Sequence, residues 1–384
     1  MIIIDNQEEL NSFCNKSSKK PFICIDTEFM RESTFFSVLC LIQIATDDTE
    51  VVIDPLAKDI NLAPLINILL DSNVTKVFHA ARQDIEIFYH ICGEVPKNIF
   101  DTQIAAMALG FRESIGYSSL VKGRLNINID KGERFTDWSR RPLTKNQLKY
   151  ALADVTHLRD LYPGLVKELT EKNRSSWIKE ETNQLTDKKL YSFEPENAWE
   201  RLKIRNPKVS YLAALKAAAA WREKRAIEKN IPRRRVLKDE ILYNIAQQKP
   251  KNLQSLMKLR GIPRGFESSK SAEDLIELII TAVANAEVYA PNPPKIKHMP
   301  PNLGPTVEML KTLLRLRTEY VGIAPKLVAT SNDIVDIAAF GEKSKAKALT
   351  GWRKEIYGTE AIDMLNGRIG LCLEGREVVV RKIN

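Results

Sequence analysis

Residues 22–45 read FICIDTEFMRESTFFSVLCLIQIA, and this stretch decides the fold class of the first part of the chain. Two apolar, β-branched runs, 22–26 and 38–45, flank a short polar segment, and this pattern predicts two strands. Strand-like runs follow at 51–53 and 76–78, and helical patterns lie at 62–70, 83–91, 102–109 and about 144–170, the last expected to be interrupted by Pro163. We therefore predict an α/β domain over residues 1–170.

The rest of the chain has a different character. Residues 171–205 are polar without clear periodicity, which predicts a connecting segment. Helical patterns separated by breakers fill 206–288, and a proline-rich stretch at 289–305 favours a stiff linker. Residues 306–384 return to helical patterns and end in the strand-like LCLEGREVVV. We predict two small all-α bundles joined by the linker.

The composition excludes several classes of protein. The chain has 384 residues, 44% hydrophobic and 28% charged, which is typical of a soluble protein of two or three domains. We see no signal peptide and no run of about 18 apolar residues, so we expect a cytoplasmic protein. The five cysteines lack CxxC spacing, which argues against a disulfide framework or a zinc site.

Charge is unevenly distributed along the chain. Residues 1–199 hold 24 Lys and Arg against 29 Asp and Glu, a net charge of −5, whereas residues 200–384 hold 34 against 20, a net charge of +14. A basic half of this kind suits a polyanionic partner such as nucleic acid, because neutralised phosphates release their counterions. A basic, solvated surface without a partner is the alternative.

Asp26 and Glu28 are the first candidate site residues. Residues two apart in a strand project to the same side, so both carboxylates could face one cation. A solvated strand end is the common reading of such a pair taken alone. Their position directly after the apolar run FICI changes this, because ionised carboxylates that emerge from a buried strand need a partner or a metal.

Two further acidic residues complete the pattern. Asp84 lies in HAARQD. Asp154 follows Tyr150 by four residues in a helical pattern, so the side chains of Tyr150 and Asp154 share one helix face. Taken together and in this order, the four acidic residues and Tyr150 resemble the exonuclease motifs of the DEDD superfamily, in its tyrosine-bearing branch. An ordinary helix with one surface Asp and one half-buried Tyr is the alternative for the last pair alone.

The resemblance extends over nearly the whole chain. FICIDTEFMRESTFFSVLCLIQIA, VFHAARQDIEIFYH, FDTQIAAMALG and LKYALADVTHLRDLY resemble segments of the ribonuclease D family. Residues 212–246 resemble its HRDC domain, and GWRKEIYG with AIDMLNGR resembles a second copy. The family implies a ribonuclease-H-like exonuclease domain, a mixed sheet flanked by helices, followed by two HRDC bundles.

The resemblance also assigns roles to the site residues. It implies two divalent cations per site, Mg²⁺ or Mn²⁺, which prefer carboxylate oxygens. Asp26 would bridge both ions, Glu28 and Asp154 would complete the one that activates water, and Asp84 would hold the other. Tyr150 would orient the nucleophile, since a hydroxyl with an unperturbed pKa of about 10 is a poor base.

Other positions carry weaker predictions. From their local position, Thr27, Phe29, Met30 and His79 are candidates to contact the terminal nucleotide, although His79 could equally bond backbone in the core. Asp101 precedes a helical run and is predicted to be its N-cap.

The basic half offers one dense positive run. Arg233–Arg235 follows a helix break, where its side chains could reach a phosphate, and a solvated loop is nearly as plausible. The nearby aromatic residues fall at helical core spacing and are predicted to pack rather than stack on bases: Tyr211, Trp221, Tyr243 and Phe266.

The sequence therefore predicts a 3′→5′ exoribonuclease that releases 5′-mononucleotides, with precursor-tRNA 3′ ends as the substrate that the family implies. No membrane or obligate protein partner is evident. A DNA-directed 3′→5′ exonuclease is one alternative, because the 2′-hydroxyl contact is invisible in sequence. A catalytically inactive nucleic-acid-binding scaffold is another, although all five motif residues are present. A helicase is disfavoured because no GxxxxGK[ST] phosphate loop occurs.

Overall fold

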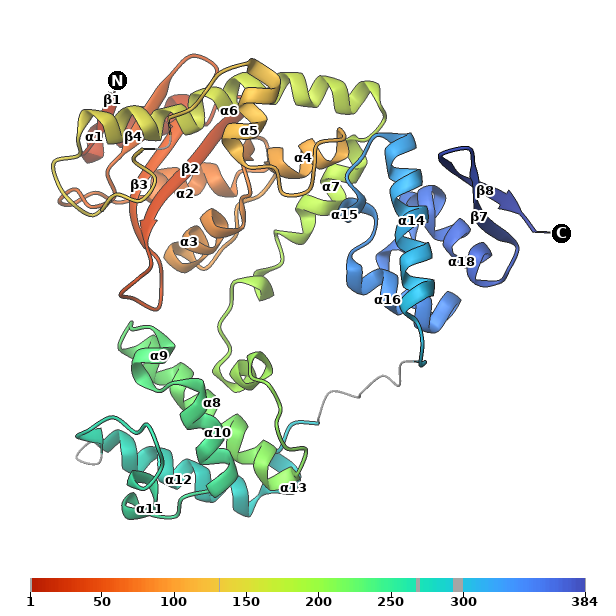
Figure 1. Ribbon diagram of the computed structural model, residues 1–384. Coiled ribbons are helices and arrows are strands. Elements are labelled where there is room, and N and C mark those ends of the chain that lie inside the picture. The colour runs from red at the N-terminus through yellow and green to blue at the C-terminus, as the bar shows by residue number, and fades with distance from the viewer. Residues whose placement is uncertain (1, 131, 267–269, 293–299, 384) are drawn as a thin grey trace. The chain divides into compact units, whose positions relative to one another are not determined.

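The structure is a computed structural model that describes residues 2–130, 132–266, 270–292 and 300–383 (Figure 1). The chain divides into two compact units. Residues 1–28, 40–188 and 298–384 form the first unit, and residues 29–39 and 189–297 form the second. Across the described ranges, no helix has the length and apolar character that crossing a membrane would require.

A mixed sheet of six strands organises the first unit, in the order β1-β4-β3-β2-β5-β6. β1 pairs parallel with β4, β3 pairs antiparallel with β4, and β2, β5 and β6 are mutually parallel. Strands β1 to β6 span Ile2–Ile4, Phe22–Met30, Val38–Ala45, Glu50–Ile53, Thr75–Phe78 and Ile99–Asp101. The mixed sheet expected from the resemblance is confirmed.

Seven helices accompany this sheet, and the longest, α6, packs on one face of it. Cys24, Ala45 and Val77 of the sheet share a core cluster with Val155 and Leu158 of α6. Helices α1 to α7 span Gln7–Ser17, Ala63–Leu70, Arg82–Cys92, Thr102–Ala108, Tyr117–Leu125, Lys145–Glu171 and Ser175–Gln184. The contact between α6 and the sheet fixes the face on which the candidate site is built.

The predicted interruption of α6 at Pro163 is wrong. The helix runs from Lys145 to Glu171 with Pro163 inside it. Pro163 is exposed, whereas Leu161, Leu165 and Leu169 are buried on the opposite side. Proline removes one backbone hydrogen bond, and the continuous apolar contacts on both sides of it keep the helix intact.

The segment expected to be only a connection contains structure. Helix α7 lies within it, and its Ile178 is buried in the core cluster that also contains Leu165 of α6. Two 3₁₀ helices follow, at Lys188–Leu190 and Pro195–Arg201. The sequence did not predict α7 because the helix is largely polar and few of its residues are buried. Its buried Ile178 packs against residues that are distant in sequence.

The C-terminal part of the first unit is a small helical module with its own core. Its helices α14 to α18 span Gly304–Val321, Pro325–Val328, Ser331–Phe340, Gly351–Arg353 and Thr359–Leu365. The hairpin β7–β8, Ile369–Glu374 and Glu377–Lys382, closes the chain and confirms the predicted strand character. Part of the predicted linker, residues 293–299, lies outside the described residues.

This C-terminal module docks on α7. The rings of Trp177 and Trp352 stack with centroids 4.0 Å apart and an interplanar angle of 7°. The buried Arg353 guanidinium donates to Glu180 and Glu181 of α7. On the other flank, Arg174 donates to the backbone carbonyl of Val321 at 2.6 Å. The contact therefore combines aromatic stacking with ion pairs and backbone hydrogen bonds.

The second unit is a helical bundle built around α8. Its helices α8 to α13 span Val209–Glu228, Arg233–Val236, Asp239–Gln248, Leu253–Met257, Lys270–Ala284 and Ala286–Tyr289. Alanine fills much of α8, which lets its neighbours approach closely around a single core. The predicted packing role of the aromatic residues is confirmed, because Tyr211, Trp221 and Tyr243 are buried in this core and Phe266 packs against it.

The connection between β2 and β3 belongs to the second unit and is anchored there. The side-chain oxygen of Asn230 accepts hydrogen bonds from the backbone N–H of Phe35 and of Phe36, each 3.0 Å long. The guanidinium of Arg233 lies 4.4 Å from the centroid of the buried Phe35 ring. Phe193 adds an edge-on contact to Phe35 at 5.0 Å.

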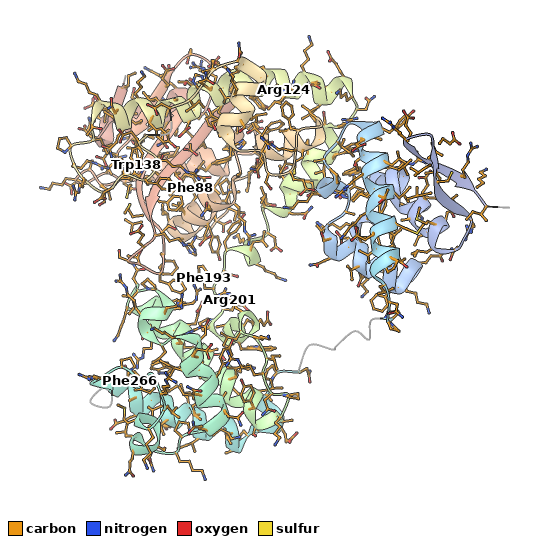
Figure 2. The ribbon with its side chains drawn as sticks, viewed as in Figure 1. Phe88, Arg124, Trp138, Phe193, Arg201 and Phe266 are labelled. Atoms are coloured by element: carbon orange, nitrogen blue, oxygen red, sulfur yellow. The ribbon has the colours of Figure 1, made fainter. Side chains whose placement is uncertain are left out.

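Arg233 also makes an internal ion pair. It donates two hydrogen bonds to the carboxylate of Glu223, which is 1% exposed and is also paired with Arg201. The guanidinium of Arg201 in turn lies 5.7 Å from the centroid of the Phe193 ring (Figure 2). Arg233 is therefore engaged inside the unit rather than presented to a phosphate, whereas Arg234 and Arg235 are exposed.

Candidate active site

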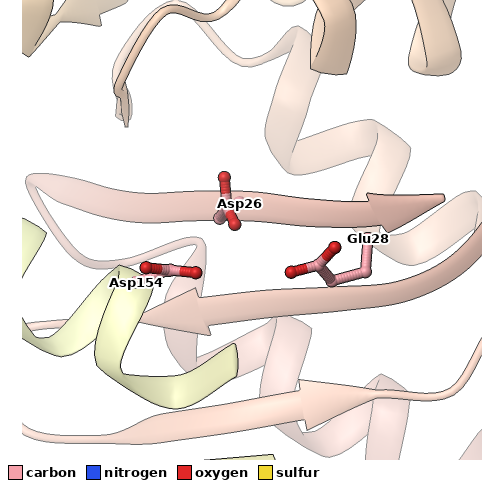
Figure 3. A group of neighbouring side chains, drawn as sticks. All are labelled: Asp26, Glu28 and Asp154. Atoms are coloured by element: carbon pink, nitrogen blue, oxygen red, sulfur yellow. The ribbon is translucent and has the colours of Figure 1, made fainter. Parts of the chain in front are cut away.

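Three of the predicted carboxylates converge in the first unit. Asp26 and Glu28 project from β2, and Asp154 projects from α6 toward them (Figure 3). One carboxylate oxygen from each residue lies within 4.8 Å of one from each of the others. The alternation of β2 puts Asp26 and Glu28 on the face that α6 covers, and the packing of Val155 on that face brings the preceding Asp154 over the strand.

Asp84 lies near this group and comes from another element. It lies in the first turn of α3, directly after β5, which is the parallel neighbour of β2. The hydroxyl of Thr27 donates to the Asp84 carboxylate over 2.5 Å, and burial, followed by the negative charge of Asp26, raises the pKa of Asp84. Sequence order alone cannot show this proximity, because it depends on the pairing of β2 with β5.

Burial and mutual repulsion hold protons on these groups. The pKa of Glu28 is raised to about 9, first by burial and then by the charges of Asp26, Asp154 and Asp84. Burial raises the pKa of Asp154 to about 7, and the pKa values of Asp26 and Asp84 are raised well above their usual range. At neutral pH the cluster therefore needs protons or cations to neutralise it.

Tyr150 joins the cluster as a hydrogen-bond donor. It lies one helical turn before Asp154 on α6, and its hydroxyl donates to the Asp154 carboxylate, which lowers the pKa of that acid. Burial and the neighbouring carboxylates raise the pKa of Tyr150 itself. The phenol therefore keeps its proton and orients groups through it.

The loop before α6 adds one positive charge that sequence reasoning missed. The positive charge of Arg134 opposes the rise that burial causes in the pKa values of Glu28 and Asp154. The loop is held by Trp138, whose ring is 2% exposed and lies 6.1 Å from that of Tyr150, and by Arg141, which makes two hydrogen bonds to Asp54. The segment has no periodicity, so its basic and aromatic residues were the available signal.

The four candidate substrate-contacting residues differ in their surroundings. Phe29 and Met30 are half-buried at the end of β2, and Thr27 bonds Asp84. His79 has both ring nitrogens engaged, since Nδ1 lies 3.0 Å from the Thr102 hydroxyl oxygen and Nε2 lies 3.1 Å from the Ile115 carbonyl. Burial lowers the pKa of His79, so the neutral ring donates through Nε2. These bonds fit a role in holding the surrounding loops.

Asp101 has the predicted N-cap role and a second function. Its carboxylate accepts from the backbone N–H of Gln103 at 2.8 Å, which caps α4. It also accepts from the N–H groups of Ala80 and Ala81, and Ala80 has φ of 60°. Asp101 therefore fixes the strained turn that leads into α3 and so sets where Asp84 lies.

The ligand types fit hard divalent cations. The cluster offers carboxylate oxygens and one phenol, with neither thiol nor imidazole among them, as Mg²⁺ and Mn²⁺ prefer. Its mutual repulsion would be relieved by positive charge. Arg134 supplies one such charge against four carboxylates, so the residues present fit a site for metal ions.

Comparison with known proteins agrees with this geometry. A 3′-5′ exonuclease family model matches residues 1–170, and the HRDC domain model matches residues 212–279. Ribonuclease D of Nitrobacter hamburgensis is 44% identical over 379 residues, covering 99% of each chain, and that of a Jannaschia species is 43% identical over 389 residues. The chain belongs to the ribonuclease D family.

A solved structure supports the assignment independently. Escherichia coli RNase D, described as an exoribonuclease involved in structured RNA processing, superposes with a TM-score of 0.81 at 30% identity, covering 94% of this chain and 97% of that one. This member of the ribonuclease D family is a 3′→5′ exoribonuclease with an HRDC domain. The HRDC model matches one segment, so the expectation of two such domains is confirmed for the first.

Proposed function

We propose that the chain removes 5′-mononucleotides from RNA 3′ ends at a site for two Mg²⁺ or Mn²⁺ ions held by Asp26, Glu28, Asp84 and Asp154. The observation that carries this is the convergence of the carboxylates of β2 and α6, with Asp84 of α3 close enough for its charge to raise the pKa of Glu28. When bound, two such ions stabilise charge on the attacking and leaving oxygens of an in-line displacement.

The chain's own residues prepare this chemistry. Asp26 would be shared by both ions, Glu28 and Asp154 would complete one site, and Asp84, which accepts a hydrogen bond from Thr27, would complete the other. Tyr150 keeps its proton and orients the attacking water by hydrogen bonding. Phe29 and Met30, at the end of β2, would pack against the terminal nucleotide, and His79 would hold the adjoining loop.

Precursor-tRNA 3′ ends are the substrates that we propose, in the cytoplasm where tRNA matures. The basic C-terminal half, with a net charge of +14 over residues 200–384, would bind the phosphates of structured RNA. Exposed Arg234 and Arg235 on α9 are candidates for such contacts.

A precursor tRNA labelled at either end tests polarity, product and cofactor together. With Mg²⁺ or Mn²⁺, 3′-labelled RNA should release labelled 5′-mononucleotide at once, and 5′-labelled RNA should shorten gradually. Asp26→Asn should abolish nucleotide release while retaining RNA binding. Metal-dependent release by purified Asp26→Asn protein would refute the site, and a matched DNA 3′ end that is cleaved as fast would favour the DNA-directed alternative.

We further propose that residues 306–384 form a second HRDC-like module, after the linker 289–305, and that residues 206–288 form the first. Both contain a long helix, then a four-residue helix, then a ten-residue helix. The four-residue helices α9 and α15 each begin six residues before the next helix. This shared order of helices supports duplication of one module more strongly than the sequence repeat does.

A further inference from the structure

Gln43 is a buried amide for which the described residues offer no hydrogen-bond partner. It lies in β3, is 0% exposed, and neither its side-chain nitrogen nor its side-chain oxygen is bonded. Its neighbours Ile42 and Ile44 are fully buried as well. Native proteins rarely leave a buried polar group unpaired, and each exception calls for a functional or structural explanation.

The alternation of the strands puts Gln43 on the face of the active site. Ala45 of β3 and Cys24 of β2 share one core cluster beneath α6. Gln43 lies two residues before Ala45, and Asp26 lies two residues after Cys24. Side chains two apart in a strand point to the same face, so Gln43 and Asp26 both project toward α6.

The antiparallel pairing of the strands places Gln43 and Asp26 on the same side of the shared cluster along the sheet. β2 and β3 are neighbours in the sheet, and the connection at 31–37 is too short for a parallel crossover, so they run antiparallel. Figure 3 shows the strand beside β2 running in the opposite direction. Two residues forward from Cys24 and two residues back from Ala45 are therefore the same displacement along the sheet.

Side-chain hydroxyls of the described residues donate to two of the carboxylates. The Thr27 hydroxyl serves Asp84, and the Tyr150 hydroxyl serves Asp154. Asp26 receives a backbone N–H from Thr27. An amide can steady a carboxylate without adding charge, whereas a second basic residue would compete with metal ions for it.

We propose that Gln43 is a positioning residue of the metal site, whose side-chain N–H donates to the Asp26 carboxylate and fixes its orientation when divalent cations bind. The inference rests on the metal site of the proposed function. It explains why an amide occupies a position that apolar residues fill on both sides. In this role Gln43 acts through Asp26 and touches neither RNA nor the reacting atoms.

Gln43→Met separates this role from a purely structural one. Met has a similar volume and no hydrogen-bonding group, so the metal-free variant should unfold at a temperature equal to or above that of the wild type. The Mg²⁺ concentration that gives half of the metal-induced rise in unfolding temperature, measured without RNA, should increase about 10- to 100-fold. On RNA, kcat should fall and KM should change little.

Gln147→Met is the matched control. Gln147 is also a buried amide, but its oxygen accepts from the Thr144 N–H and its nitrogen donates to the Thr136 hydroxyl. Removing these bonds should lower the unfolding temperature of the metal-free protein and leave the Mg²⁺ midpoint unchanged. Gln43→Met should therefore change the Mg²⁺ midpoint, and Gln147→Met should change the unfolding temperature of the metal-free protein.

The outcomes are separable. An unchanged Mg²⁺ midpoint in Gln43→Met would overturn the inference, and so would a loss of metal-free stability as the only effect. If Gln43→Met does not fold, the same unfolding temperature and Mg²⁺ midpoint are measured for Gln43→Leu and Gln43→Asn. Failure of all three variants to fold would overturn the inference and make Gln43 a structural core residue. A wild-type protein that shows no Mg²⁺-induced rise would instead refute the proposed metal site.

Discussion

At the scale of single residues, the candidate active site destabilises the metal-free fold. Asp26, Glu28 and Asp154 bring their carboxylates together where burial disfavours charge. A folded-state pKa above the unfolded value means that the acid weakens the fold as the pH rises past its ordinary pKa. Arg134 and the Tyr150 hydroxyl offset part of this penalty for Asp154.

Replacing Asp154 should therefore stabilise the metal-free protein. Because its pKa is about 7 in the fold and 3.8 ordinarily, the carboxylate increasingly destabilises the fold between these pH values. At pH 8, Asp154→Asn should raise the free energy of unfolding by about 1–3 kcal/mol. Near pH 4 the gain should vanish. Thermal unfolding across this pH range measures it, with EDTA present.

The same variant should lose the response to metal. Mg²⁺ should raise the unfolding temperature of the wild type and have little effect on Asp154→Asn, because binding only to the folded state stabilises it. Asp160→Asn, six residues further on α6 and exposed, is the matched control and should keep the wild-type response. Equal metal responses in Asp154→Asn and the wild type would contradict the assignment of Asp154 as a ligand.

At the scale of elements, α9 is an anchor rather than a basic loop. Arg233 links the buried Glu223 to the Phe35 ring, so Arg233→Met leaves that carboxylate with Arg201, which is half exposed. Weakening a buried ion pair is strongly destabilising, and we expect a loss of about 2–4 kcal/mol. Urea unfolding of the full chain, followed by tryptophan fluorescence, measures it.

Arg234→Met provides the comparison on the same helix. Arg234 is exposed, and surface substitutions usually change stability by no more than about 0.5 kcal/mol. If Arg233→Met and Arg234→Met unfold at the same urea concentration, the anchoring role of Arg233 is wrong.

The elements that the sequence predicted are those with strong periodicity. Val38–Ala45 was predicted to the residue because its apolar run is long and bounded by polar residues. Ile2–Ile4 and Ile99–Asp101 escaped notice because three residues carry too little pattern, and α1 because it is largely polar. Pro163 misled because a local rule took no account of the packing around it.

The site shows the same division between local and tertiary information. Strand alternation alone predicts that Asp26 and Glu28 share one face, and this needs no knowledge of the fold. Asp84 and Asp154 required the family resemblance, since the pairing of β5 with β2 and the packing of α6 bring them near. Gln43 carried no usable signal, because a buried amide acquires its role from neighbours that are distant in sequence. Arg134 had only the basic and aromatic character of its segment as a signal.

At the scale of the whole molecule, the two halves of the sequence carry opposite net charges. The half with the carboxylate cluster is net acidic, and the half beyond residue 200 is strongly basic. Affinity for structured RNA should thus come largely from the basic half and should fall steeply with salt.

Arg234→Gln combined with Arg235→Gln tests this division in the folded chain. Each lost phosphate contact reduces the slope of log affinity against log salt by about 1, so the double variant should bind precursor tRNA with a slope shallower by about 1–2. Cleavage of a short single strand should be unchanged. Filter binding at several salt concentrations gives the slope, and an unaltered slope would remove α9 from the RNA surface.

Truncation after Arg205 should leave chemistry on short strands and weaken binding to structured RNA, with a shallower salt slope. The structure indicates that truncation should also lower stability. The truncated chain loses Asn230 and Arg233 as partners of Phe35, and Trp352 as the partner of Trp177. We therefore also expect a lower unfolding temperature, and activity should be assayed well below it. Wild-type affinity and salt slope in the truncated chain would refute the proposed role of the basic half in binding structured RNA.

The anchored connection between β2 and β3 limits how this enzyme could be rebuilt. Its two ends continue into the strands that carry Asp26 and Gln43, while its middle is held by Asn230 and Arg233. A chimera that grafts the helical bundle of another family member onto this exonuclease domain would have to import residues 29–39 along with it. Natural recombination would meet the same constraint, so the short connection and the bundle are expected to be inherited together.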